Sequence, residues 1–248
     1  MSGHSKWSTI KHKKGKADAR RGKLFTKLIR EITTAAREGG GDQDGNPRLR
    51  SAVLAARAAN MPSDNIAKAI QRGTGELPGV SYDEVLYEGY GPGGVAVMLQ
   101  VLTDNRNRTT AEIRHLFGKF GGNLGESGCV AFLFKKQGYL IVPKTAGSEE
   151  TVMEAALEAG AEDFSAEDPD LFEIYSAPDE LHKVKTALES QGLAIEQAKV
   201  DMIPTTQVHL EDKRADQMIR LMDAFEDHDD VQNVWANFDI DERILQAS

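Results

Sequence analysis

The chain has 248 residues, of which 40% are hydrophobic and 28% are charged, a composition that excludes wholesale disorder and fits one large domain or two to three small ones. No apolar run approaches the roughly 18 to 20 residues of a membrane span, and the basic start leads to no apolar segment of a secretory signal. Cys129, the one cysteine, excludes an internal disulfide and a cysteine zinc cluster. We therefore expect a cytoplasmic protein with no membrane partner.

The net charge of -9 conceals a separation of charge along the chain. Residues 1–75 carry 16 Lys and Arg against six Asp and Glu, a net charge of +10, whereas the remaining residues together carry -19. A basic segment on an acidic body favours a polyanionic partner at one end of the protein.

The basic segment is expected to be an arm followed by three helices. Residues 1–17 show no apolar period, and a helix predicted from about Asp18 to Glu38 ends at three glycines. Asn46-Pro47 has the chemistry of a helix N-cap and first turn, which predicts a second helix running to about residue 60. Met61-Pro62-Ser63 ends that helix and precedes a short third one.

The first helix is predicted to have two different faces at 100° per residue. Apolar side chains lie on one side and are expected to pack into a core: Leu24, Phe25, Leu28, Ile29, Ile32, Ala35 and Ala36. The opposite side, here called the cationic stripe, consists of Arg20, Lys23, Lys27, Arg30 and Arg37.

After a linker at 74–79 the pattern changes to short strands alternating with helices. Helices are predicted over 109–120, 149–159, 179–190 and 213–225. Strands are predicted over 95–103, 129–134, 139–142, 163–166, 171–176, 194–202, 206–210 and 231–238.

This order predicts an α+β protein with two ferredoxin-like domains, the third domain being inserted in the second. Residues 139–203 alone give the ferredoxin-like order β-α-β-β-α-β, and the flanking pieces 82–135 and 205–240 each give β-α-β. The expected domains are a helical, nucleic-acid-binding one over 1–77, a discontinuous α+β one over 78–136 and 204–248, and an inserted α+β one over 137–203.

The arm and the cationic stripe are the first candidate binding site. Lysines and arginines bind phosphates largely without sequence specificity, and Trp7 and the histidines of the arm could stack on unpaired bases. The predicted nucleic-acid contacts are Lys6, Trp7, Lys11, His12, Lys13, Lys14, Lys16, Arg20, Lys23, Lys27 and Arg30. The alternative is a solvated helix face and a frayed terminus, which the charge separation makes less favourable.

Arg106 and Arg108 are a second candidate site for nucleic acid. Thr109 and Glu112 have the spacing of a capping box, which predicts that both arginines lie in the loop just before a helix N-terminus, where anions are favoured. The alternative is that these arginines pair with the acidic body and hold domains together. The sequence does not favour either alternative.

The remaining motifs predict neither an enzyme nor a cofactor. Residues 89–94 satisfy G-x-G-x-x-G, but a strand follows them, so a tight turn is the better interpretation. Cys129 opens an apolar run and is expected to be packed rather than reactive. The acidic run 226–230 could hold a hard cation but is more typical of a solvated turn, and no metal site is predicted.

Several longer motifs resemble the YebC/PmpR family of probable transcriptional regulators, whose mitochondrial relative is the translational activator of cytochrome c oxidase. They extend over essentially the full chain: Gly3-His4-Ser5-Lys6-Trp7, Arg21-Gly22-Lys23-Leu24-Phe25-Thr26-Lys27, Asn46-Pro47-Arg48-Leu49-Arg50, Asn60-Met61-Pro62, residues 87–94, residues 103–109 and Asp229-Asp230-Val231-Gln232-Asn233-Val234. The resemblance implies a helical N-terminal domain, two α+β domains and a cytoplasmic, non-enzymatic protein that acts in gene expression.

Two functions are compatible with these observations. The first is a DNA-binding transcriptional regulator whose contacts are made mainly by the basic N-terminal domain, although no convincing helix-turn-helix is present. The alternative is a translation factor that associates with ribosomal RNA or the ribosome and relieves stalling at difficult sequences. Neither function requires a small-molecule substrate.

Overall fold

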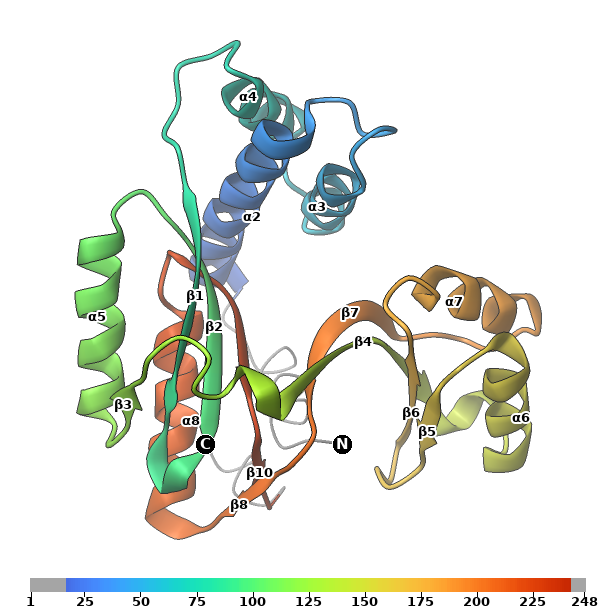
Figure 1. Ribbon diagram of the computed structural model, residues 1–248. Helices are drawn as coiled ribbons and strands as arrows, with labels where there is room; N and C mark the ends of the chain where they lie inside the picture. The colour runs from blue at the N-terminus through green and yellow to red at the C-terminus, as the bar shows by residue number, and fades with distance from the viewer. Residues whose placement is uncertain (1–16, 242–248) are drawn as a thin grey trace.

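The computed structural model describes residues 17–241, with side chains described from Arg21 onward, and the chain folds into three parts (Figure 1). A group of helices lies at one end, a sheet with two long helices lies below it, and a smaller sheet with two helices projects to the side. Among the described helices, none is long and apolar enough to cross a membrane.

The N-terminal domain consists of the three predicted helices, α2 (Ala17–Gly39), α3 (Pro47–Ala58) and α4 (Ser63–Thr74). Asn46 caps α3 by accepting a hydrogen bond from the Leu49 N–H at 3.0 Å. Its amide also donates to the carbonyls of Ala35 and Gly40, so one buried side chain fixes the start of α3 against the end of α2.

Close packing of α4 on α2 depends on a glycine inside α4. A Cβ atom added at Gly73 would lie 2.5 Å from the carbonyl oxygen of Thr33. The apolar face of α2 forms the core of this domain with side chains of α3 and α4, as its period predicts.

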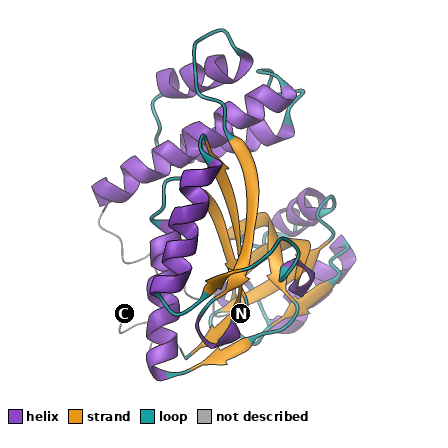
Figure 2. Cartoon of the chain, turned by 60° about the vertical axis from the view of Figure 1, so that its left-hand side comes forward, coloured by secondary structure: helices purple, strands orange, loops and turns teal. Residues whose placement is uncertain are grey.

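The second domain is a four-stranded antiparallel sheet with the strand order β3-β1-β2-β9. Its strands are β1 (Asp83–Tyr90), β2 (Ala96–Thr103), β3 (Asn123–Leu124) and β9 (Val231–Ala236). Helices α5 (Arg106–Lys119) and α8 (Asp212–Glu226) pack on the same face, where Val97, Leu99 and Val101 of β2 point. Figure 2 shows long helices in front of the strands when this side is turned forward. The short strands β8 (Val208–Leu210) and β10 (Phe238–Ile240) pair in parallel beside this sheet.

Two details of the predicted second domain are wrong. The sequence pattern does not predict strand β1, so the first flanking piece is β-β-α-β, with β1 and β2 joined by the tight turn expected at 89–94. The strand predicted over 129–134 is absent: residues 129–133 include a short 3-10 turn (Ala131–Leu133), and Phe134 is already the first residue of the next strand. The buried Glu88 carboxylate accepts the backbone N–H groups of this segment, which a strand would have paired with another strand.

The third domain has the predicted order β-α-β-β-α-β and the sheet order β5-β6-β4-β7, all antiparallel. Its elements are β4 (Phe134–Pro143), α6 (Glu149–Ala159), β5 (Asp163–Ser165), β6 (Leu171–Ser176), α7 (Leu181–Ser190) and β7 (Gln197–Pro204). The α+β class, the helical N-terminal domain and the inserted unit are thereby confirmed. Strands β4 and β7 run through the predicted boundaries at 136/137 and 203/204, and the boundaries themselves stay predictions.

Candidate nucleic-acid interface

Part of the predicted site can be located and part cannot. The arm residues Lys6, Trp7, Lys11, His12, Lys13, Lys14 and Lys16 lie outside the described residues. Arg20 lies on α2, and nothing is described of its side chain. The predicted contacts with described side chains are therefore Lys23, Lys27 and Arg30 of the cationic stripe and Arg106 and Arg108 of α5.

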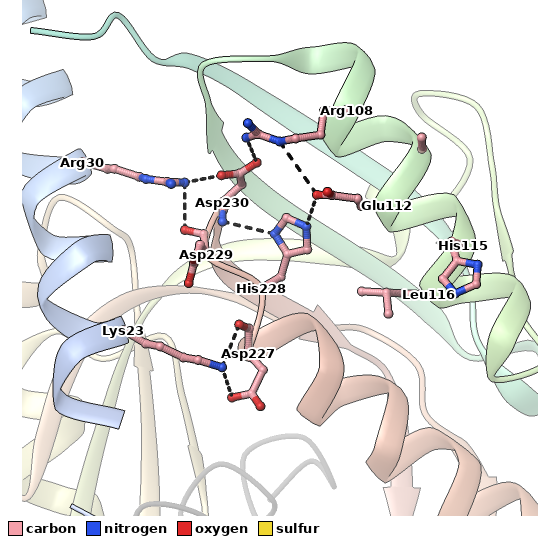
Figure 3. A pocket seen from close by; sticks show the side chains of 11 residues that line it. Lys23, Arg30, Arg108, Glu112, His115, Leu116, Asp227, His228, Asp229 and Asp230 are labelled. Carbon is pink, nitrogen blue, oxygen red and sulfur yellow. Dashed lines mark hydrogen bonds and ion pairs between the residues drawn. The ribbon is translucent and has the colours of Figure 1, made fainter. Parts of the chain in front are cut away.

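Lys23 and Arg30 of the cationic stripe face the acidic residues Asp227, Asp229 and Asp230 (Figure 3). Lys23 Nζ lies 3.4 Å from a carboxylate oxygen of Asp227 and donates to the Asp227 carbonyl at 3.2 Å. Lys27 Nζ donates to the carbonyl of Glu226 at 2.7 Å. Because Glu226 is the last residue of α8, the two lysines bind at the negative end of that helix dipole.

Arg30 is partly buried, with a side chain that is 14% exposed against 44% for Lys23. Its guanidinium donates to the Asp229 carbonyl at 2.9 Å, to the Leu102 carbonyl at 3.2 Å and to the Asp230 carboxylate. This one side chain therefore joins α2 to the end of β2 and to the turn before β9.

Asp230, whose side chain is 3% exposed, is the centre of this contact. Arg108 donates to it at 2.8 Å from the side opposite Arg30, and the Thr109 hydroxyl donates at 2.5 Å. Burial alone would raise the pKa of Asp230, but the hydrogen bonds from Thr109, Arg108 and Arg30 outweigh it and lower the pKa from 3.8 to about 2. The carboxylate is therefore ionised at neutral pH and holds three elements together.

The predicted capping box at Thr109 is wrong. Helix α5 begins at Arg106, and its N-cap is Asn105, whose side chain accepts the Arg108 N–H at 3.1 Å. Thr109 is inside the helix and fully buried, and its hydroxyl donates a hydrogen bond to Asp230. Arg106 and Arg108 thus lie in the first turn of the helix rather than in the preceding loop.

The two arginines of α5 that are predicted to bind nucleic acid differ in their surroundings. Arg108 pairs with Asp104 at 2.9 Å and with Asp230, so for this residue the structure shows the intramolecular pairing that is the alternative to phosphate binding. Arg106 is exposed, and its side chain forms no ion pair within residues 21–241.

Arg48 makes a second charged contact, which the sequence interpretation missed. Its guanidinium pairs with Glu31 at 2.7 Å, Glu38 at 2.7 Å and Glu84 at 2.9 Å, and so joins α3 to α2 and to β1. The hydrogen bond to Glu31 is the main cause of the raised pKa of Arg48, which remains charged. Arg48 lies in the sequence motif Asn46–Arg50, but nothing in that motif indicates three distant acids.

Glu112, His228 and Asp230 are the described residues that could hold a metal ion, because one ligand atom from each lies within 4.8 Å of the others. They are already engaged with one another: His228 Nε2 lies 2.9 Å from Glu112, and Nδ1 accepts the Asp230 N–H. The guanidinium of Arg108 also contacts both carboxylates and would repel a divalent cation. The donors therefore fit a hydrogen-bond network better than a metal site.

Other cations of the N-terminal domain remain available to a partner. Arg37, Arg57, Lys68 and Arg72 are exposed, and none forms an ion pair with another residue in the described part of the chain. Lys68 and Arg72 lie one turn apart on α4. Arg37 belongs to the cationic stripe, and Arg57, Lys68 and Arg72 extend the candidate interface beyond it.

Comparison with known proteins agrees with this architecture. A family model described as the TACO1/YebC protein N-terminal domain matches residues 5–76, and one described as the TACO1/YebC second and third domain matches residues 82–238. The chain belongs to the TACO1/YebC family. Similar relatives in this family are named probable transcriptional regulatory proteins. One from Desulforapulum autotrophicum is 59% identical and one from Persephonella marina 57% identical, the alignments covering 100% and 99% of both chains.

A solved structure is also similar to this chain. It is the crystal structure of a conserved hypothetical protein from Aquifex aeolicus, 53% identical, with a TM-score of 0.80 over 94% of this chain and 96% of that one.

Proposed function

We propose that this TACO1/YebC-family protein is a cytoplasmic transcriptional regulator that binds DNA mainly through its N-terminal domain. The observation that carries the proposal is the charge separation, +10 over residues 1–75 against -19 over the rest of the chain. The names of its relatives point to the same function.

The cations proposed to contact phosphate are those of the arm together with Arg106 and the exposed Arg37, Arg57, Lys68 and Arg72. Lys23 and Lys27 are proposed to contact phosphate as well, once their contacts with the C-terminal end of α8 are broken. Cations that neutralise phosphates release condensed counterions, so the affinity for DNA is expected to fall steeply with salt. Arg30 and Arg108 are proposed to position the N-terminal domain rather than to contact DNA, because both are committed to Asp230.

The proposed activity is binding without catalysis. Asp230 has a pKa near 2 and is paired with two arginines, which makes it a poor general acid or base at neutral pH. Burial raises the pKa of Cys129, so the thiol rather than the nucleophilic thiolate is favoured.

Crosslinking of the protein to nucleic acid in cells, followed by sequencing, tests the proposal. Enrichment at promoter DNA is expected, and a purified promoter duplex is expected to bind at least about 10³-fold more tightly than a scrambled duplex at physiological salt. Equal affinity for the two duplexes would contradict sequence-specific regulation. Enrichment at ribosomal RNA without promoter DNA would instead favour the translation factor.

A further inference from the structure

The contact between the cationic stripe and the end of α8 has the form of a protein–phosphate contact. Lys23, Lys27 and Arg30 are spaced by four and three residues and present one face of α2. Against this face lie backbone carbonyls and carboxylates in place of phosphate oxygens.

We propose that Asp227 and the C-terminal carbonyls of α8 are an internal competitor that occupies Lys23 in the free protein and is displaced from it by DNA phosphate. This inference rests on the proposed function and concerns its regulation: part of the binding surface is neutralised until a polyanion is present. Asp227 thereby lowers the affinity for any polyanion that binds Lys23.

The exposures indicate which contacts can exchange. The side chains of Lys23 and Asp227 are 44% and 63% exposed, and their separation of 3.4 Å is that of a loose pair. Exposed pairs of this kind are weak because water and salt screen them. Arg30 and Asp230 are 14% and 3% exposed and are held by several hydrogen bonds, so they remain in place when Lys23 changes partner.

Asp227→Asn tests this competition, measured as affinity for a 30-base-pair duplex at 0.15 M salt. The expected gain is about two- to five-fold, the upper end corresponding to about 1 kcal/mol for an exposed ion pair. Asp216→Asn is the matched control, because Asp216 is an exposed acid on α8, about 16 Å along the axis from Asp227, which caps the end of that helix. That distance exceeds the screening length of about 8 Å, so the control is expected to gain less.

The same substitution in a Lys23→Met background separates competition from general repulsion. If Asp227 acts by occupying Lys23, Asp227→Asn gives no gain over Lys23→Met alone. A gain that persists in this background, or an equal gain for Asp216→Asn, overturns the inference and leaves the proposed function intact. A wild-type protein without salt-dependent binding to the duplex contradicts both. Thermal melts check that the variants are folded. Little change in melting temperature is expected, because the side chains of Lys23 and Asp227 are exposed.

Discussion

Replacing Asp230 by Asn is expected to weaken the folded state substantially. The carboxylate accepts hydrogen bonds from Arg30, Arg108 and Thr109 and is 3% exposed. Its pKa of about 2, against an ordinary 3.8, means that the fold favours the charged form by about 2 kcal/mol, since one pKa unit corresponds to about 1.36 kcal/mol. Loss of the charge also leaves the partly buried Arg30 without its carboxylate partner, so the free energy of unfolding should fall by about 2–3 kcal/mol at pH 7.

Urea denaturation followed by circular dichroism measures this decrease, with Asp229→Asn as the control. Asp229 is adjacent and exposed, and its contact with Arg30 uses only the backbone carbonyl, which the substitution keeps. Asp229→Asn is therefore expected to change stability by no more than about 0.5 kcal/mol. Equal decreases for the two variants would refute the reasoning that the Asp230 side chain is the centre of the contact.

The pH dependence of the same difference follows from the lowered pKa. A carboxyl group whose folded pKa lies below its unfolded pKa stabilises the protein above the unfolded value. For Asp230 this stabilisation is complete above about pH 5 and is lost as the pH falls through 3.8 toward 2. The stability difference between wild type and Asp230→Asn should therefore shrink over this range.

Further predictions concern the N-terminal domain and are measured by the same denaturation assay. Asn46→Ala should cost about 2 kcal/mol, because it removes the cap of α3 and leaves the Ala35 and Gly40 carbonyls without their amide donor; a decrease below about 0.5 kcal/mol would contradict this. Gly73→Ala should destabilise by at least about 1–3 kcal/mol, because the new Cβ meets the Thr33 carbonyl. Gly22→Ala, with open space around its Cβ, should instead stabilise the protein by about 0.5–1 kcal/mol. Changes in the free energy of unfolding with the same sign for the two variants would contradict this argument.

The sequence predicts best what depends on local patterns. The two faces of α2, the cap at Asn46 and the β-α-β-β-α-β order of the third domain all follow from short-range spacing, and the structure confirms them. The sequence pattern does not predict strand β1, because acids lie on both of its faces. One of them, Glu88, is buried, and its hydrogen-bond partners lie at least 40 residues away along the chain.

The same limit applies to the candidate site. In the sequence, the run Glu226–Asp230 has the pattern of a solvated turn. The pattern does not show that Asp230 is paired, because its partners Arg30 and Arg108 are 200 and 122 residues away along the chain. From sequence alone, changing Lys13, Lys14, Lys23 and Lys27 to Glu is expected to abolish polyanion binding while the melting temperature barely changes. The structure changes that expectation: Glu at position 23 would face Asp227, so this variant should also loosen the N-terminal domain.

The dependence of DNA affinity on salt tests most directly whether the basic N-terminal segment binds DNA. Wild type is compared with a variant in which Lys11, Lys13, Lys14 and Lys16 are Ala, and with a control in which Lys119, Lys183, Lys185 and Lys213, outside that segment, are Ala. Removal of one lysine that neutralises a phosphate should flatten the log–log slope by about 0.9 for a duplex. The slope of the arm variant is expected to be shallower than that of wild type by up to about 3.6, while the control keeps the wild-type slope; equal slopes for all three proteins would contradict the account.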